Sequence, residues 1–165
     1  MKRHRTTLMA IALSLGMSFA VVGLVAANHE IVIGFQCDRT GATQTIGVNL
    51  CPGYHDYVKL VNAKGGVRGH KIRVVEVDHE YKVPPAIESY ERFRKEGAVV
   101  ISVYGTPQIY ALTAKLTEDQ IPGTSPGFGK AATADGTRYP YIFPIAATYY
   151  SQAAAAIQWR SGATP

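Results

Sequence analysis

Short apolar runs alternate along this chain with segments of helical length, and this alternation constrains the fold more than any other feature. Three of the runs span Glu30–Phe35, Ile72–Val77 and Ala98–Val103, and they have the length and β-branched content of strands. The third run has no alternating polar positions, as expected for a parallel strand buried on both faces. Strands separated by helices predict an α/β fold, with a doubly wound, mostly parallel sheet in flavodoxin-like order.

Glycines and prolines indicate where the helices begin and end. We expect helices at residues 49–64, 84–96, 107–119 and 150–159, and two further strands at 120–125 and 141–143. Asn49 is a good N-cap, and Pro52 would then fall in the first helical turn, where its missing N–H is harmless. Gly65 and Gly66 permit a left-handed cap that ends this helix.

The loops that follow the strands are the expected place for a ligand, because ligands of such sheets bind beyond the carboxyl ends of the strands. These loops lie at 36–45, 78–83, 104–107 and 125–130. Their glycines let main-chain N–H groups approach a ligand closely, and a helix N-terminus adds partial positive charge. Hydroxyl groups supply further donors and aromatic rings supply apolar walls. We predict a site for a small anion formed by Tyr104, Gly105, Thr106, Ser125, Gly127, Phe128, Gly129 and Tyr149, with Tyr81 as a further candidate wall.

The same loop residues also suit a purely structural role. Glycine, proline and hydroxyl residues are typical of turns, and aromatic residues at strand ends often cap a core. The loops alone do not separate this interpretation from a ligand site.

The first 27 residues predict a cleavable export signal. Lys2, Arg3 and Arg5 form a basic start, an apolar stretch follows, and small residues precede a cleavage point after Ala27. Cleavage would leave the chain from residue 28 in the periplasm without stable membrane insertion. The alternative is an uncleaved membrane anchor, because the apolar stretch is long enough to span a bilayer.

Cysteine content and charge exclude several classes of function. Cys37 and Cys51 are expected near a strand end and a helix start, where a disulfide is feasible in an oxidising compartment. Two separate thiols are the alternative. No paired Cys or His spacing accompanies them, so neither a metal site nor a cofactor is expected. The net charge of +5 includes the three basic residues of the export signal. The sequence has no stripe of basic residues, so we do not expect nucleic-acid binding.

Catalytic motifs are weak or lacking. Residues 127–132 match a G-x-G-x-x-A dinucleotide fingerprint, but they follow the fourth strand and have no acidic partner at the expected distance. Residues 123–130 resemble a phosphate loop with one spacer residue too many. There is no G-x-S-x-G or H-E-x-x-H motif. We expect His79–Glu80 to lie in a solvated loop. We expect no catalytic residue; an exported α/β hydrolase-like enzyme using Ser125 is the alternative.

One turn resembles a known family. Residues 61–69 read V-N-A-K-G-G-V-R-G and are similar to the N-x-x-G-G-[IV]-x-G turn of the leucine/isoleucine/valine-binding proteins. These are type I periplasmic solute-binding proteins of branched-chain amino acid ABC importers. Ile33–Gly34 with Thr40–Gly41, and Ile121–Pro122 with Ser125–Gly127, resemble strands and ligand loops of the same family. The resemblance extends from about Ile31 to Trp159.

The resemblance implies a two-lobed protein that closes on its ligand, with residues 28–165 as an incomplete N-terminal lobe. It implies that the ligand carboxylate is held at Gly105, Thr106 and residues 127–129, with the side chain against Tyr104 and Phe128. An acidic residue of the second lobe usually meets the amino group. An ABC permease and its ATPase are the implied partners. Because the chain ends near the crossing to that lobe, we expect a fragment or truncated gene product, and a non-functional remnant is a further alternative.

The family is broad, and it includes binders of amides and of aromatic acids. The tyrosine and phenylalanine content of this chain is compatible with such ligands. The sequence therefore predicts a solute-binding component for amino acids or related small carboxylates and amides.

Overall fold

The computed structural model describes residues 29–126 and 135–162. Strands and helices alternate in the order that the sequence predicts. The elements are β1 (Ile31–Cys37), α1 (Gln44–Ala63), β2 (Ile72–Asp78), α2 (Val83–Lys95), β3 (Val100–Ser102), α3 (Thr106–Glu118), β4 (Gly123–Ser125), β5 (Ile142–Pro144) and α4 (Tyr149–Ser161).

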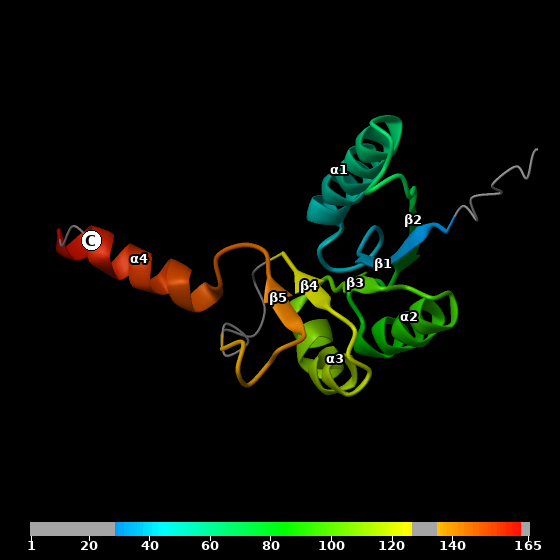
Figure 1. The fold of residues 1–165 in the computed structure, drawn as a ribbon. Coiled ribbons are helices and arrows are strands. Elements are labelled where there is room, and N and C mark those ends of the chain that lie inside the picture. Colours follow the sequence, from blue (N-terminus) through cyan, green and yellow to red (C-terminus); the bar gives the residue numbers. More distant parts are fainter. Residues whose placement is uncertain (1–28, 127–134, 163–165) are drawn as a thin grey trace, which may run out of the picture.

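The strands form one parallel sheet with the order β2-β1-β3-β4-β5. This arrangement confirms the predicted α/β fold and its flavodoxin-like strand order. Helix α1 lies on one face of the sheet, and α2 and α3 cover the other (Figure 1). The strand order reverses between β1 and β3, so the chain leaves these two neighbours toward opposite faces. Sheets of this type bind ligands at such a reversal.

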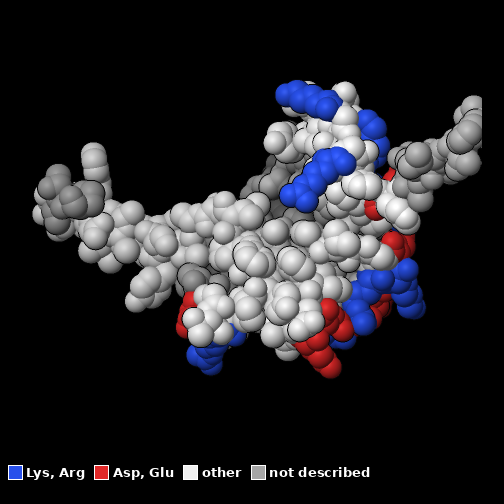
Figure 2. Space-filling model, viewed as in Figure 1, with Lys and Arg blue, Asp and Glu red and all other residues white. Residues whose placement is uncertain are grey.

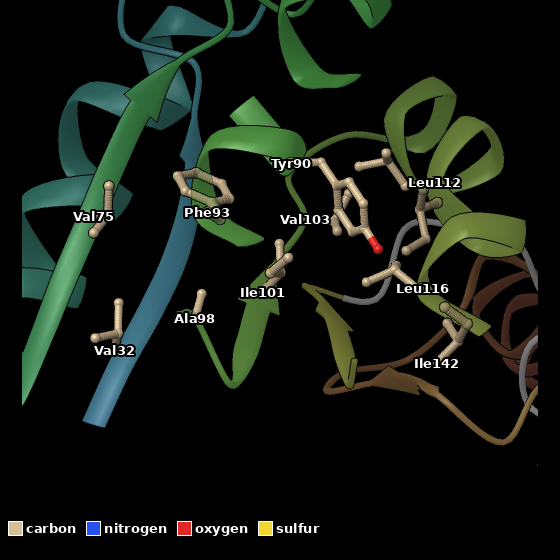
Figure 3. Packing of buried hydrophobic residues seen from close by; sticks show 11 residues of the cluster. Val32, Val75, Tyr90, Phe93, Ala98, Ile101, Val103, Leu112, Leu116 and Ile142 are labelled. Atoms are coloured by element: carbon tan, nitrogen blue, oxygen red, sulfur yellow. The ribbon is translucent and has the colours of Figure 1, made fainter. Parts of the chain in front are cut away.

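The main core lies between the sheet and the pair α2–α3 (Figure 3). Tyr90 and Phe93 of α2 and Leu116 of α3 are fully buried against Ile101 of β3. The Tyr90 hydroxyl donates a hydrogen bond to the Asp119 carboxylate at 2.5 Å and lies 3.1 Å from the Lys115 carbonyl oxygen, so its polar end is satisfied. The apolar strand positions predicted from sequence therefore pack mainly under these two helices.

A second, smaller core attaches α1 to β1. Cys37 and Cys51 form a disulfide with a Cα–Cα distance of 6.3 Å, which decides between the two predicted alternatives. Beside it, the rings of Phe35 and Tyr54 stack with centroids 4.0 Å apart. This cluster fixes α1 over the carboxyl end of β1.

The predicted start of the first helix is wrong. The helix begins at Gln44 rather than near Asn49, and Pro52 lies inside it. The buried Asp38 carboxylate accepts hydrogen bonds from the N–H groups of Gly41 and Thr43, both at 2.6 Å. These bonds close the turn after β1 and start the helix early. Pro52 is tolerated because it is exposed, so water can bond the carbonyl that loses its helical partner.

Helix α4 stands apart from the rest of the molecule. The Thr148 hydroxyl accepts a hydrogen bond from the Ser151 N–H at its start, and Gly162 adopts a left-handed conformation at its end. None of its residues is buried, and it projects away from the sheet (Figure 1). Within residues 29–126 and 135–162, no helix is both long and apolar enough to cross a membrane.

Candidate functional site

A cavity of about 200 Å³ opens at the carboxyl ends of the strands. The segments that follow the strands form the wall of the cavity. The cavity therefore spans the reversal of strand order between β1 and β3. It is lined by Thr43, Ile46, Tyr81, Tyr104, Gly105, Thr106, Ser125, Pro126 and Tyr149.

Five of the eight predicted site residues meet at this cavity, namely Tyr104, Gly105, Thr106, Ser125 and Tyr149. The other three, Gly127, Phe128 and Gly129, lie outside the described residues. The candidate wall residue Tyr81 also lines the cavity.

Sequence reasoning missed three lining residues: Thr43, Ile46 and Pro126. Thr43 lies in a loop that was expected at this edge of the sheet, so its position was a usable signal. Ile46 was not identifiable because the helix that carries it was expected to begin later.

The N-terminus of α3 forms one wall. Gly105 is its N-cap, with φ 108° and ψ 144°, a backbone conformation that favours glycine. A Cβ atom there would lie 2.0 Å from Gln108 Oε1, so a larger residue would have to displace Gln108 as well as strain the backbone. Gly105 and Thr106 both line the cavity, and the partial positive charge of the helix N-terminus therefore lies at its wall. Such a wall suits a carboxylate.

A buried histidine supports the aromatic part of the wall. Tyr81 and Tyr104 meet edge to face with centroids 6.2 Å apart. His79 is fully buried; its Nε2–H donates to the Tyr104 carbonyl at 2.8 Å, and its Nδ1 accepts from the Tyr81 N–H at 2.9 Å. Burial lowers the pKa of His79 and keeps the ring neutral. The predicted solvated loop at His79 is therefore wrong, because tertiary hydrogen bonds satisfy both ring nitrogens.

The loop after β1 braces the same wall from the other side. The Thr43 hydroxyl donates to Asp38 Oδ2 at 2.6 Å, and Thr43 lines the same cavity as Tyr104. Burial raises the pKa of Tyr104, so its hydroxyl is neutral. The polar end of the cavity thus presents hydroxyl groups and a helix N-terminus.

A second cavity of about 240 Å³ adjoins the first and shares Tyr104 and Pro126 with it. Its lining is mostly apolar and consists of Phe35, Leu50, Tyr54, Ser102, Tyr104, Pro126 and Ile145. A solute with a polar head and an apolar body could occupy both cavities at once.

Among the described residues, no lysine, arginine, aspartate or glutamate lines either cavity. Lysine and arginine side chains are visible in the region of α1, and residues of both signs lie along the edge formed by α2 and α3 (Figure 2). In residues 29–126 and 135–162, no group of three or more His, Cys, Asp or Glu side chains is placed to hold a metal ion.

Comparison with known proteins identifies the family. The family model described as periplasmic binding protein matches residues 30–164. The chain belongs to the periplasmic binding protein family. This match confirms the resemblance found in the sequence and does not favour the hydrolase alternative. No curated protein matches the chain.

Solved structures agree with this assignment. A protein of the Pseudomonas fluorescens group described as an ABC transporter permease is 32% identical, with a TM-score of 0.72, and the match covers 82% of this chain and 34% of that one. A branched-chain amino acid ABC transporter protein of Thermus thermophilus with bound valine is 21% identical, with a TM-score of 0.74. That match covers 81% of this chain and 35% of the Thermus protein.

A third solved structure is the branched-chain amino acid transporter substrate-binding protein LivJ of Streptococcus pneumoniae in complex with isoleucine. It is 22% identical, with a TM-score of 0.63, and the match covers 73% of this chain and 34% of LivJ. At such identities the Thermus and Streptococcus proteins support the fold alone. This periplasmic binding protein chain spans about a third of the length of the structures it matches, and its sheet corresponds to their first lobe.

Proposed function

We propose that this chain provides the first-lobe part of a solute-binding site for an ABC importer, and that the solute is an amino acid or a related small carboxylate or amide. One observation carries the proposal: the N-terminus of α3, with Gly105 and Thr106, meets Ser125 and three tyrosine side chains at one cavity. Among its structural relatives are proteins with bound isoleucine and valine, and one described as a fatty acid substrate-binding protein.

The two cavities suggest how such a solute is held. Its carboxylate lies at the N-terminus of α3, where the helix dipole and the hydroxyl groups of Thr106 and Ser125 favour negative charge. Its apolar body extends past Tyr104 into the second cavity, toward Phe35 and Tyr54. Burial of apolar surface there contributes about 25 cal/mol per Å² of area removed from water.

The proposal also includes export of the chain and its role in transport. Residues 1–27 act as the signal that sends the chain to the periplasm, and residues 28–165 form the N-terminal lobe. The partners are a permease and its ATPase. The solute is bound and released without chemical change, so no turnover is expected.

Ligand-dependent stabilisation tests the binding function. The chain is titrated with L-leucine, L-isoleucine, L-valine and L-phenylalanine, and the melting temperature and binding heat are measured. We expect Thr106→Ala to weaken binding of the tightest of these by about 1–3 kcal/mol, because a hydrogen bond to a charged group is lost. Thr137→Ala, at an exposed turn, is the matched control. Equal affinity of both variants would remove Thr106 from the site.

A further inference from the structure

His79 links two of the tyrosine residues at the cavity wall. Its Nε2 lies 2.8 Å from the Tyr104 carbonyl oxygen, and its Nδ1 lies 2.9 Å from the main-chain nitrogen of Tyr81. A carbonyl oxygen only accepts a hydrogen bond and a main-chain N–H only donates one, so the ring proton must be on Nε2 and Nδ1 must be bare. Only the neutral ring fits this arrangement, because an imidazolium ring would direct a second N–H at the N–H of Tyr81.

The turn that carries Tyr81 is held by His79. Glu80 and Tyr81 have φ values of 55° and 59°, a left-handed conformation that is costly for residues with large side chains. Two hydrogen bonds to His79 hold this turn: Nδ1 accepts from the Tyr81 N–H, and the carbonyl accepts from the Lys82 N–H at 2.8 Å. Loss of the first bond would release a strained turn at the point where Tyr81 lines the cavity.

Neighbouring groups determine the pH at which the ring becomes charged. Burial lowers the pKa of His79, and the Tyr104 carbonyl and the carboxylates of Asp38 and Asp78 raise it less, so the pKa lies below its ordinary value of about 6.5. The ring is therefore neutral near pH 7 and takes up a proton only in acid.

The other segments beside the ring add no net charge. Glu80 and Lys82, ahead of α2, form an exposed ion pair with an N–O distance of 2.6 Å. Residues 106–109, the first turn of α3, have no charged side chain. Asp38 and Asp78 are thus the acidic groups whose own titration must be separated from that of His79.

We propose that His79 is a pH-sensitive positioning residue: the neutral ring holds Tyr81 and Tyr104 at the cavity wall, and protonation breaks the bond to Tyr81 and weakens solute binding. This proposal rests on the proposed solute-binding function. The proton comes from solvent and is placed on Nδ1, the atom that accepts from the Tyr81 N–H in the neutral state. Solute affinity is therefore full near neutral pH and falls as the pH drops through the folded pKa of His79.

The first measurement follows the unliganded chain by NMR with isotope-labelled nitrogen. Near neutral pH we expect the His79 proton on Nε2. In acid, the His79 ring signals and the Tyr81 amide signal should shift with one common midpoint. A proton on Nδ1 near neutral pH, a ring that stays neutral until the chain unfolds, or a Tyr81 amide that does not respond to the ring would overturn the proposal.

His79→Asn is the matched variant for this measurement. An asparagine side-chain oxygen can accept from the N–H two residues later, as Nδ1 of His79 does here, but it does not titrate. The Tyr81 amide signal of this variant should therefore lack the acid transition, although Asp38 and Asp78 are still present. The titration of the original chain needs no variant, so it decides the matter even if His79→Asn does not fold.

The second measurement compares affinity with pH. L-leucine, L-isoleucine, L-valine and L-phenylalanine are titrated from one pH unit above the midpoint found for His79 to one unit below it. We expect the affinity of the tightest to fall by about tenfold, because the fraction of chain with a neutral ring falls to about a tenth. His79→Asn should keep its affinity across this interval. His70→Asn makes the same change at an exposed position and should show the profile of the original chain.

The outcomes separate this proposal from the function on which it rests. An equal fall in His79→Asn would assign the pH dependence to other groups, and it would leave solute binding standing. Constant affinity in the original chain across the interval would overturn the role of His79 in the same way. If none of the four solutes binds near neutral pH, the solute-binding function fails and this proposal fails with it.

Discussion

Gly105 has no side chain, and this allows the backbone conformation that places the N-terminus of α3 at the cavity. The residue has φ 108°, and Gln108 Oε1 lies 2.0 Å from the position that an added Cβ would occupy. We expect Gly105→Ala to lower the free energy of unfolding by about 1–3 kcal/mol, because a Cβ strains this backbone and displaces Gln108. Urea denaturation measures the change.

Gly53→Ala is the matched control for this prediction. Gly53 lies inside α1, and nothing lies within 4 Å of the position of its added Cβ. Alanine is favoured over glycine in a helix interior, so this variant should gain roughly 0.5–1 kcal/mol. If both variants change stability in the same direction, the argument from backbone conformation is incorrect.

The place of a site residue could be predicted where it depends only on which strand the residue follows in the sequence. Tyr104, Gly105 and Thr106 directly follow a buried strand, so their place at the carboxyl edge was apparent from the sequence. His79 and Gln108 gave no such signal, because burial of a polar side chain depends on which main-chain groups approach it in the folded chain. No local periodicity reports those approaches.

The attachment of α1 to β1 depends on the disulfide between Cys37 and Cys51, which are 14 residues apart. Closing a loop of this size restricts the unfolded chain by about 3 kcal/mol in the chain-entropy model. We expect the double variant Cys37→Ala/Cys51→Ala to lose about 2–4 kcal/mol of unfolding free energy in urea. Dithiothreitol should destabilise the original chain and leave the double variant unaffected. A reductant effect of equal size on both would exclude the disulfide as its cause.

Glu76 joins three elements, and its contribution should depend on pH. On β2 it accepts hydrogen bonds from Arg39 after β1, at 2.5 Å, and from His55 on α1, at 2.6 Å. Burial raises the pKa of Glu76, but these two partners outweigh burial and hold the pKa below its usual value. A carboxyl group of this kind stabilises the fold above its unfolded pKa of about 4.3, and the stabilisation is lost as pH falls through the folded pKa.

Glu76→Gln tests this pH dependence. Near neutral pH we expect the variant to be about 1 kcal/mol less stable than the original chain, since the ion pairs are partly exposed. The difference should shrink in acid, once the original carboxyl group is protonated. Glu88→Gln, on the exposed side of α2, is the control and should show no such profile. A stability difference that persists at low pH would indicate lost packing rather than lost charge.

Elements were predictable in type and order but less so at their ends. Apolar runs and glycine or proline boundaries located every strand and helix that the structure describes. The start of α1 was misplaced because the hydrogen bonds of Asp38 determine it, and these depend on how the turn folds back. Strands β3 (Val100–Ser102) and β4 (Gly123–Ser125) are shorter than the predicted strands at 98–103 and 120–125.

For the whole molecule, the sheet order was predicted from the alternation of strands and helices, whereas the packing of the two faces of the sheet was not predicted. The face under α2 and α3 is closed by a continuous core. Phe143 of β5 and Ile145 beyond it remain about half exposed or more, at 49% and 66%. Sequence periodicity indicates that a residue is apolar, but it does not indicate which element will cover it.

The isolation of α4 gives a prediction for the whole chain. Trp159 is the single tryptophan of the sequence and is 89% exposed on this helix. We expect acrylamide to quench its fluorescence in the native chain nearly as efficiently as in the urea-unfolded chain, because the ring is almost fully exposed. An isolated helix below about 15 residues is marginal in water, so the 13 residues of α4 should also exchange their amide hydrogens much faster than α3. Strong shielding of Trp159 that increases with protein concentration would mean that α4 packs against a second copy of the chain. Shielding independent of concentration would place it against the chain's own sheet, contrary to the arrangement seen here.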